Sequence, residues 1–142
     1  MSKFDKLLSF IPLLKDDGFG EWIIDRENDG SPEHLIHFPY VSYSECVNDL
    51  VHAIYDFQEN NEDFGLRNYS DILNERGVEW GTESMEAADV SDFDARTIMA
   101  LMIGAVRAER FCDGALLGFL KSGAILRWLE RLQEIVNSEQ EL

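Results

Sequence analysis

Apolar residues recur every three or four positions along most of the chain, which is the spacing of helices that bury one face. The first such segment predicts a helix over residues 3–15, which Pro12 can kink and Gly18 ends in a left-handed conformation. The second predicts a helix over residues 43–59, with Ser42 and Glu45 as its capping box. The apolar face of this second helix consists of Val47, Leu50, Val51, Ile54 and Phe57.

The middle of the chain has weaker patterns. A short helix is predicted over residues 69–76, where Gly77 stops it. Residues 78–81 read as a brief extended piece and residues 82–88 as a further helical turn.

Residues 97–106 are apolar on every side, so a helix through them is buried all round. We predict that this helix runs from Ser91 to Phe111, with Ser91 and Asp94 at its start. A short helix over residues 114–121, capped by Asp113, and an amphipathic helix over residues 123–136, capped by Ser122, are predicted to follow. The long buried helix is therefore the expected centre of the fold.

Two short segments lack the helical spacing of apolar residues and have the pattern of strands. Residues 21–24 and 34–38 are typical of strands, and Asp29-Gly30 between them is typical of the tip of a β-hairpin. A hairpin alone is marginal in water, so this one must pack on the helices. The expected fold is a single α+β domain over residues 1–142 that is predominantly α: a helical bundle with a long buried central helix and one packed β-hairpin.

Charge narrows the possible partners. The chain has 28 Asp and Glu residues against 12 Lys and Arg, a net charge of −16, whereas residues 95–136 carry a net positive charge, with 4 acidic and 6 basic side chains. Such a surface repels nucleic acid, which is bound mainly through Lys and Arg, so we expect no direct DNA or RNA binding. Two interpretations of the acidity stay open: it serves solubility, or it attracts a basic protein.

The cysteines, the N-terminal residues and the length of the apolar run indicate where in the cell the protein is expected. Cys46 and Cys112 lack the C-x-x-C spacing and sit in apolar helical patterns, so we expect reduced, buried thiols in a cytoplasmic protein. Residues 1–8 include charged side chains where a secretion signal would have an apolar segment, so we expect no such signal. Residues 97–106 fall well short of the roughly 20 apolar residues that span a bilayer, so no membrane association is expected.

Arg107 and Arg110 form the main candidate site, because two arginines three positions apart share one face at the end of an apolar helix. In one interpretation they clamp a carboxylate or phosphate. In the other they complement the helix dipole and pair with acidic residues such as Glu109 and Asp113. We favour the second, which predicts a closed, paired arrangement without a pocket.

Other candidate chemistry is weak. Asp49 and His52 have the carboxylate-x-x-His spacing of metal-binding bundles, but the apolar face of their helix turns them and Asp56 towards solvent. His34 and His37 lie three apart on a predicted strand and so point to opposite faces. We therefore predict no catalytic residue, no metal site and no cofactor, and we favour a protein that is not an enzyme while a small enzyme stays open as the alternative.

Two stretches resemble a known family. Residues 79–85 (Glu-Trp-Gly-Thr-Glu-Ser-Met) and residues 107–116, with the pattern R-x-E-R-F-x-D-G, resemble short bacterial proteins grouped only as a domain of unknown function. The resemblance covers most of the chain and implies a bacterial cytosolic protein, without any catalytic residue to carry over. The function expected from the sequence is a non-enzymatic interaction or regulatory module that acts through its negative surface on a basic partner. The alternative is a small enzyme or anion-binding protein with its site at Arg107 and Arg110.

Overall fold

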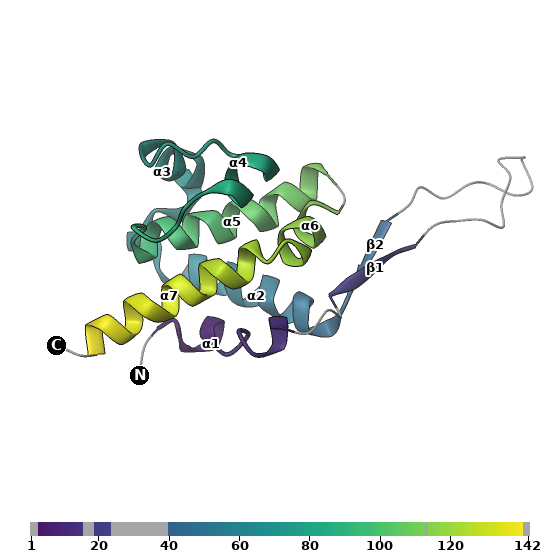
Figure 1. Ribbon diagram of the computed structural model, residues 1–142, viewed down its shortest axis with the longest axis horizontal. Coiled ribbons are helices and arrows are strands. Elements are labelled where there is room, and N and C mark those ends of the chain that lie inside the picture. The colour runs from purple at the N-terminus through teal and green to yellow at the C-terminus, as the bar shows by residue number, and fades with distance from the viewer. Residues whose placement is uncertain (1–2, 16–18, 24–39, 113, 141–142) are drawn as a thin grey trace, which may run out of the picture.

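Helices form most of the computed structural model, which describes residues 3–15, 19–23, 40–112 and 114–140 (Figure 1). The predicted, predominantly helical architecture is therefore confirmed. The α-helices are α1 (Asp5–Leu8), α2 (Glu45–Asn60), α3 (Tyr69–Glu75), α4 (Thr82–Ala87), α5 (Ala95–Phe111), α6 (Ala115–Lys121) and α7 (Ala124–Gln140). Single turns of 3-10 helix accompany them in the described residues: η1 (Leu13–Lys15), η2 (Glu62–Phe64) and η3 (Leu66–Asn68).

Helix α5 is the centre of the molecule. Every residue from Thr97 to Val106 is buried, as the unbroken apolar run predicts. In Figure 1, α3 and α4 lie on one side of α5, and α2 and α7 lie on the other. The helix begins at Ala95 and not at Ser91, because the Asp94 carboxylate accepts a hydrogen bond from the Thr97 amide at 2.9 Å and caps it there.

The two N-terminal helices differ from their predictions at their ends. The first is much shorter than predicted: α1 stops at Leu8, and the amides of Phe10 and Ile11 bond three residues back, to the carbonyl oxygens of Leu7 and Leu8, each at 3.1 Å. Pro12 has no N–H with which to resume the helix. In α2 the cap is Ser44, whose hydroxyl accepts from the Val47 amide at 3.3 Å, so the predicted cap at Ser42 is wrong.

Strands β1 (Gly20–Ile23) and β2 (Tyr40–Tyr43) pair in antiparallel fashion, with Gly20 opposite Tyr43. The first strand was predicted, whereas the predicted second strand at residues 34–38 and the turn at Asp29-Gly30 lie outside the described residues. A Cβ on Gly20 would lie 2.6 Å from the Ser42 carbonyl oxygen, so this position requires glycine. Val41 and Tyr43 pack the base of the pair against the helical core, while its other end points away from the helices in Figure 1.

The C-terminal helices form where the sequence places them. Ser122 accepts from the Ala124 amide at 3.4 Å, and α7 buries Ile125, Trp128, Leu129 and Leu132. The helix continues beyond the predicted end to Gln140. Asp113, the predicted cap of α6, lies outside the described residues. No described helix is long and apolar enough to span a bilayer.

The cysteines are only partly as expected. Both thiols are free, and Cys46 is partly buried. Burial, followed by the nearby charge of Asp49, raises the pKa of the Cys46 thiol. Cys112 is exposed, so the prediction of a buried thiol is wrong there, because the residue lies just beyond the last turn of α5.

Candidate functional site

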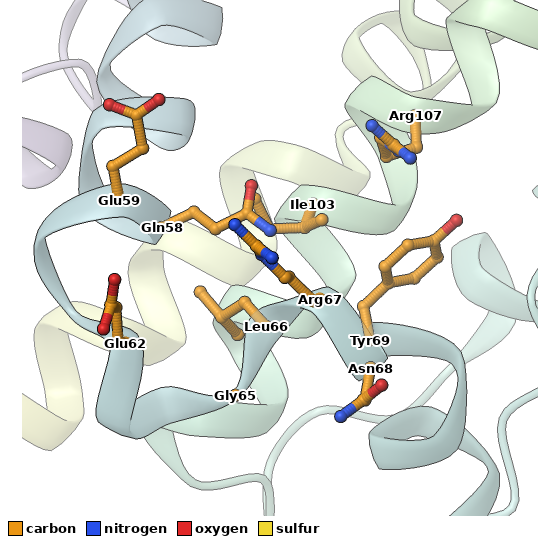
Figure 2. A pocket seen from close by; sticks show the side chains of 10 residues that line it. All are labelled: Gln58, Glu59, Glu62, Gly65, Leu66, Arg67, Asn68, Tyr69, Ile103 and Arg107. Atoms are coloured by element: carbon orange, nitrogen blue, oxygen red, sulfur yellow. The ribbon is translucent and has the colours of Figure 1, made fainter.

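A pocket of about 900 Å³ opens where the end of α2, the turns η2 and η3, and the side of α5 meet (Figure 2). Its base is apolar, since Leu66 and Ile103 are almost fully buried. Its walls carry most of the polar groups. The lining residues are Gln58, Glu59, Glu62, Gly65, Leu66, Arg67, Asn68, Tyr69, Ile103 and Arg107.

Four charged side chains of the described residues line this pocket. Figure 2 shows Glu59 and Glu62 on one side, Arg107 on the other side with Tyr69, and Arg67 between them. Within the described part of the chain, none of the four forms an ion pair. Arg67 is exposed and Arg107 is partly buried. The pocket thus presents two guanidinium groups whose donors have no carboxylate partner among the described residues.

The loop between α2 and α3 shapes the wall that carries Arg67. Gly65 separates η2 from η3 with a left-handed backbone (φ 64°), which favours glycine. The loop is tied to the start of α5, because Arg96 Nε donates to the Phe64 carbonyl oxygen at 2.8 Å. This contact holds the end of η2 against α5, and η3, which begins two residues later, carries Arg67 to the same pocket as Arg107.

Glu109, one of the two acidic members of the predicted site, has a different role. Its carboxylate accepts from the Tyr43 hydroxyl at 2.6 Å, from the Gly114 amide at 3.1 Å and from the Leu116 amide at 3.0 Å. A carboxylate at the start of α6 satisfies amides that the helix leaves without partners and complements its dipole. Glu109 therefore joins the end of α5 to α6 and β2, and it takes no part in the pocket.

Among the described members of the predicted cluster, Arg107, Glu109 and Arg110 form no ion pair with one another. Arg110 is exposed, its guanidinium carbon is 5.9 Å from the centre of the Tyr55 ring, and it forms no ion pair with a described residue. Asp113 lies outside the described residues. The expectation of a closed arrangement without a pocket is wrong for Arg107, because the pocket of Figure 2 reaches it.

Arg67 is the pocket residue that the sequence did not single out. It lies in an acidic, loop-like stretch, forty positions before Arg107, and no periodic pattern links the two. The one local signal is a lone arginine two residues after a glycine in that stretch. Nothing in the sequence distinguishes Glu59 and Glu62 from the other residues among the 28 Asp and Glu.

The other candidate chemistry stays without support. Asp49, His52 and Asp56 are exposed on α2, on the side opposite its apolar face. No group of three or more His, Cys, Asp or Glu side chains in the described residues has the arrangement of a metal site. His34 and His37 lie outside those residues.

The fold and the pocket define a mostly helical domain with a mixed-charge surface pocket against its central helix. The chain matches a Family of unknown function (DUF6508) over residues 1–138, and it belongs to that family. The predicted resemblance to an uncharacterised family is thereby confirmed. No curated protein and no solved structure matches the chain.

Proposed function

We propose that this protein is a binding module whose pocket holds a small molecule by an anionic group between Arg67 and Arg107. The observation that carries the proposal is the placement of two arginines, free of described carboxylate partners, on one pocket of a chain with net charge −16. Guanidinium groups bind carboxylate or phosphate oxygens through paired hydrogen bonds, so an anion is the ligand that these donors suit best.

Glu59 and Glu62 on the opposite side set a limit on the ligand. They repel a second negative group at that end and accept hydrogen bonds from donors there. A ligand with one anionic end and a neutral or donor-bearing remainder therefore fits the charge pattern of the pocket.

A titration with inorganic phosphate, followed through backbone amide signals by NMR, tests the proposal. We expect saturable shifts at Arg67, Asn68 and Tyr69. Arg107→Gln should weaken binding about tenfold or more, because a hydrogen bond to a charged group contributes roughly 1.5–3 kcal/mol.

Arg110→Gln is the matched control. It makes the same charge change on the same helix but outside the pocket, so its affinity for phosphate should stay within about twofold of the unchanged protein. Absence of saturable shifts, or an equal loss in both variants, would overturn the proposal.

A second candidate function rests on the exposed acidic face of α2, which consists of Glu45, Asp49, Asp56 and Glu59. None of these side chains forms an ion pair within the described chain, so this face suits a basic partner. A ten-residue lysine peptide serves as the probe. Its binding should fall steeply with salt, since exposed charges are screened over about 8 Å at physiological ionic strength.

Paired variants separate this face from net charge alone. Asp49→Asn with Asp56→Asn should weaken peptide binding more than Asp71→Asn with Glu75→Gln, which removes as much charge from the exposed side of α3. Equal weakening by both pairs would show that peptide binding depends only on net charge, and it would contradict a binding role for the acidic face of α2.

A further inference from the structure

Three aromatic side chains continue the pocket wall onto the surface. Tyr69 lines the pocket and contacts Trp80 edge to face, with ring centres 6.3 Å apart. Trp80 in turn contacts Phe111 edge to face at 5.8 Å. We call Tyr69, Trp80 and Phe111 the aromatic row. It leads from the pocket to the end of α5.

Trp80 is held in this row by the fold. Its indole Nε1 donates to the Gly104 carbonyl oxygen at 3.0 Å. A Cβ on Gly104 would lie 2.9 Å from Met85 Cε and 3.2 Å from Trp80 Cδ1, so the indole packs directly on the backbone of α5. Because Trp80 also contacts Tyr69, which lines the pocket, the ring has a fixed position beside the pocket.

The outer part of the row is open to solvent. Phe111 is 74% exposed and Trp80 is 38% exposed, and together they are two of the three large apolar side chains exposed in the described chain. Phe111 comes four residues after Arg107, which places both on one side of α5. An apolar group that covered these rings would leave water, which is favourable.

We propose that the ligand of the pocket carries an aromatic ring beside its anionic group, so that the ring packs on Trp80 and Phe111 while the anion binds Arg107. This inference rests on the proposed function and specifies its ligand class as a small aromatic carboxylate or phosphate. A pocket of about 900 Å³ lies within the roughly 300–1,000 Å³ that small-molecule sites occupy. The glutamates opposite disfavour a polyanion.

Phenyl phosphate, inorganic phosphate and benzyl alcohol separate the two halves of the ligand. Titrations are followed by NMR through the backbone amide signals of Arg67, Asn68 and Tyr69 and through the indole N–H signal of Trp80, which is assigned with Trp80→Phe. Phenyl phosphate should bind about tenfold tighter than inorganic phosphate, in the range that ring contacts provide, and it should shift the Trp80 signal. Benzyl alcohol should bind more weakly than phenyl phosphate, because it lacks the anion.

Phe111→Ala should bring the affinity for phenyl phosphate close to that for inorganic phosphate and leave phosphate binding unchanged. Its matched control is Leu13→Ala, which truncates an apolar side chain that is 53% exposed and lies in neither the pocket nor the row. That control should bind both probes as the unchanged protein does.

The contrary outcomes are distinct. If phosphate binds and phenyl phosphate binds no tighter, the inference falls and the proposed function stands. If neither probe binds, both fall. If a tetrapeptide ending in phenylalanine binds tightly and phenyl phosphate does not, the assignment to a small molecule is overturned in favour of a peptide end.

Discussion

Arg107 and Glu109 lie two positions apart on α5, and they differ in their partners within the fold. Glu109 accepts hydrogen bonds from one hydroxyl and two backbone amides, which join three elements of the fold. Arg107 forms no ion pair with a described residue and lines a pocket with Arg67. Residues two apart on a helix do not share a face, so one short motif holds both a charge that stabilises the fold and a charge available to a ligand.

The largest expected effect is the loss of the Glu109 carboxylate. Glu109→Ala leaves the Gly114 and Leu116 amides and the Tyr43 hydroxyl without this acceptor, and hydrogen bonds to a charged group contribute roughly 1.5–3 kcal/mol. We expect the free energy of unfolding in urea to fall by about 3 kcal/mol. Glu109→Gln keeps one acceptor oxygen and should lose less. A loss of under about 1 kcal/mol in the alanine variant would contradict a structural role for Glu109.

Next in size is Gly104→Leu, which tests how closely Trp80 packs on α5. The added side chain would meet Met85 and Trp80 at once, and overpacking of this kind costs about 1–3 kcal/mol. Urea unfolding and the near-ultraviolet circular dichroism of the indole should both change. Gly118→Ala is the control, because the nearest atom to its Cβ is Glu86 Oε1 at 3.7 Å, and alanine should stabilise α6 by up to about 1 kcal/mol. An unchanged Gly104→Leu protein would contradict the close contact.

A smaller effect is expected at the other end of α5, where Asp94 also serves a helix. Burial opposes ionisation of Asp94, but hydrogen bonds from Thr97 and the charges of Arg76 and Arg96 outweigh it and lower the pKa of the carboxyl. Asp94→Ala should cost about 1 kcal/mol at neutral pH.

The pH dependence of that difference has a definite sign. Because the pKa is lower in the folded state, the stabilisation is complete above the unfolded value of about 3.9 and is lost as the pH falls through the folded value. Unfolding of both proteins in urea at several pH values measures this. A difference that grows on acidification would contradict the prediction.

The sequence predicts the helices whose burial pattern is strong and misplaces several of their ends. Residues 97–106 are apolar throughout and α7 repeats its apolar face regularly, so both could be identified. The caps of α2 and α5 are ambiguous in the sequence, because each helix has two candidate capping residues within three positions of each other. Tyr43 pairs with Gly20 in the sheet, so α2 is capped at Ser44 and not at Ser42. Because Gly20 and Tyr43 are far apart in the sequence, the residues around Ser44 do not indicate this pairing.

The candidate site could be predicted only in part, for the same reason. Arg107 stood out because it follows an apolar run, whereas its pocket depends on Arg67, which a loop forty positions earlier brings to α5. Its closeness in sequence places Glu109 in the same predicted site. Its hydroxyl partner, Tyr43, lies 66 residues away and turns it towards α6 and β2.

The distinction between the two residues is tested most directly by the free energy of unfolding of Arg107→Ala in urea, measured beside Glu109→Ala. We expect Arg107→Ala to remain within about 0.5 kcal/mol of the unchanged protein, because its guanidinium has no carboxylate partner among the described residues. A loss as large as that of Glu109→Ala would show that Arg107 holds the fold and would contradict its assignment to a ligand pocket.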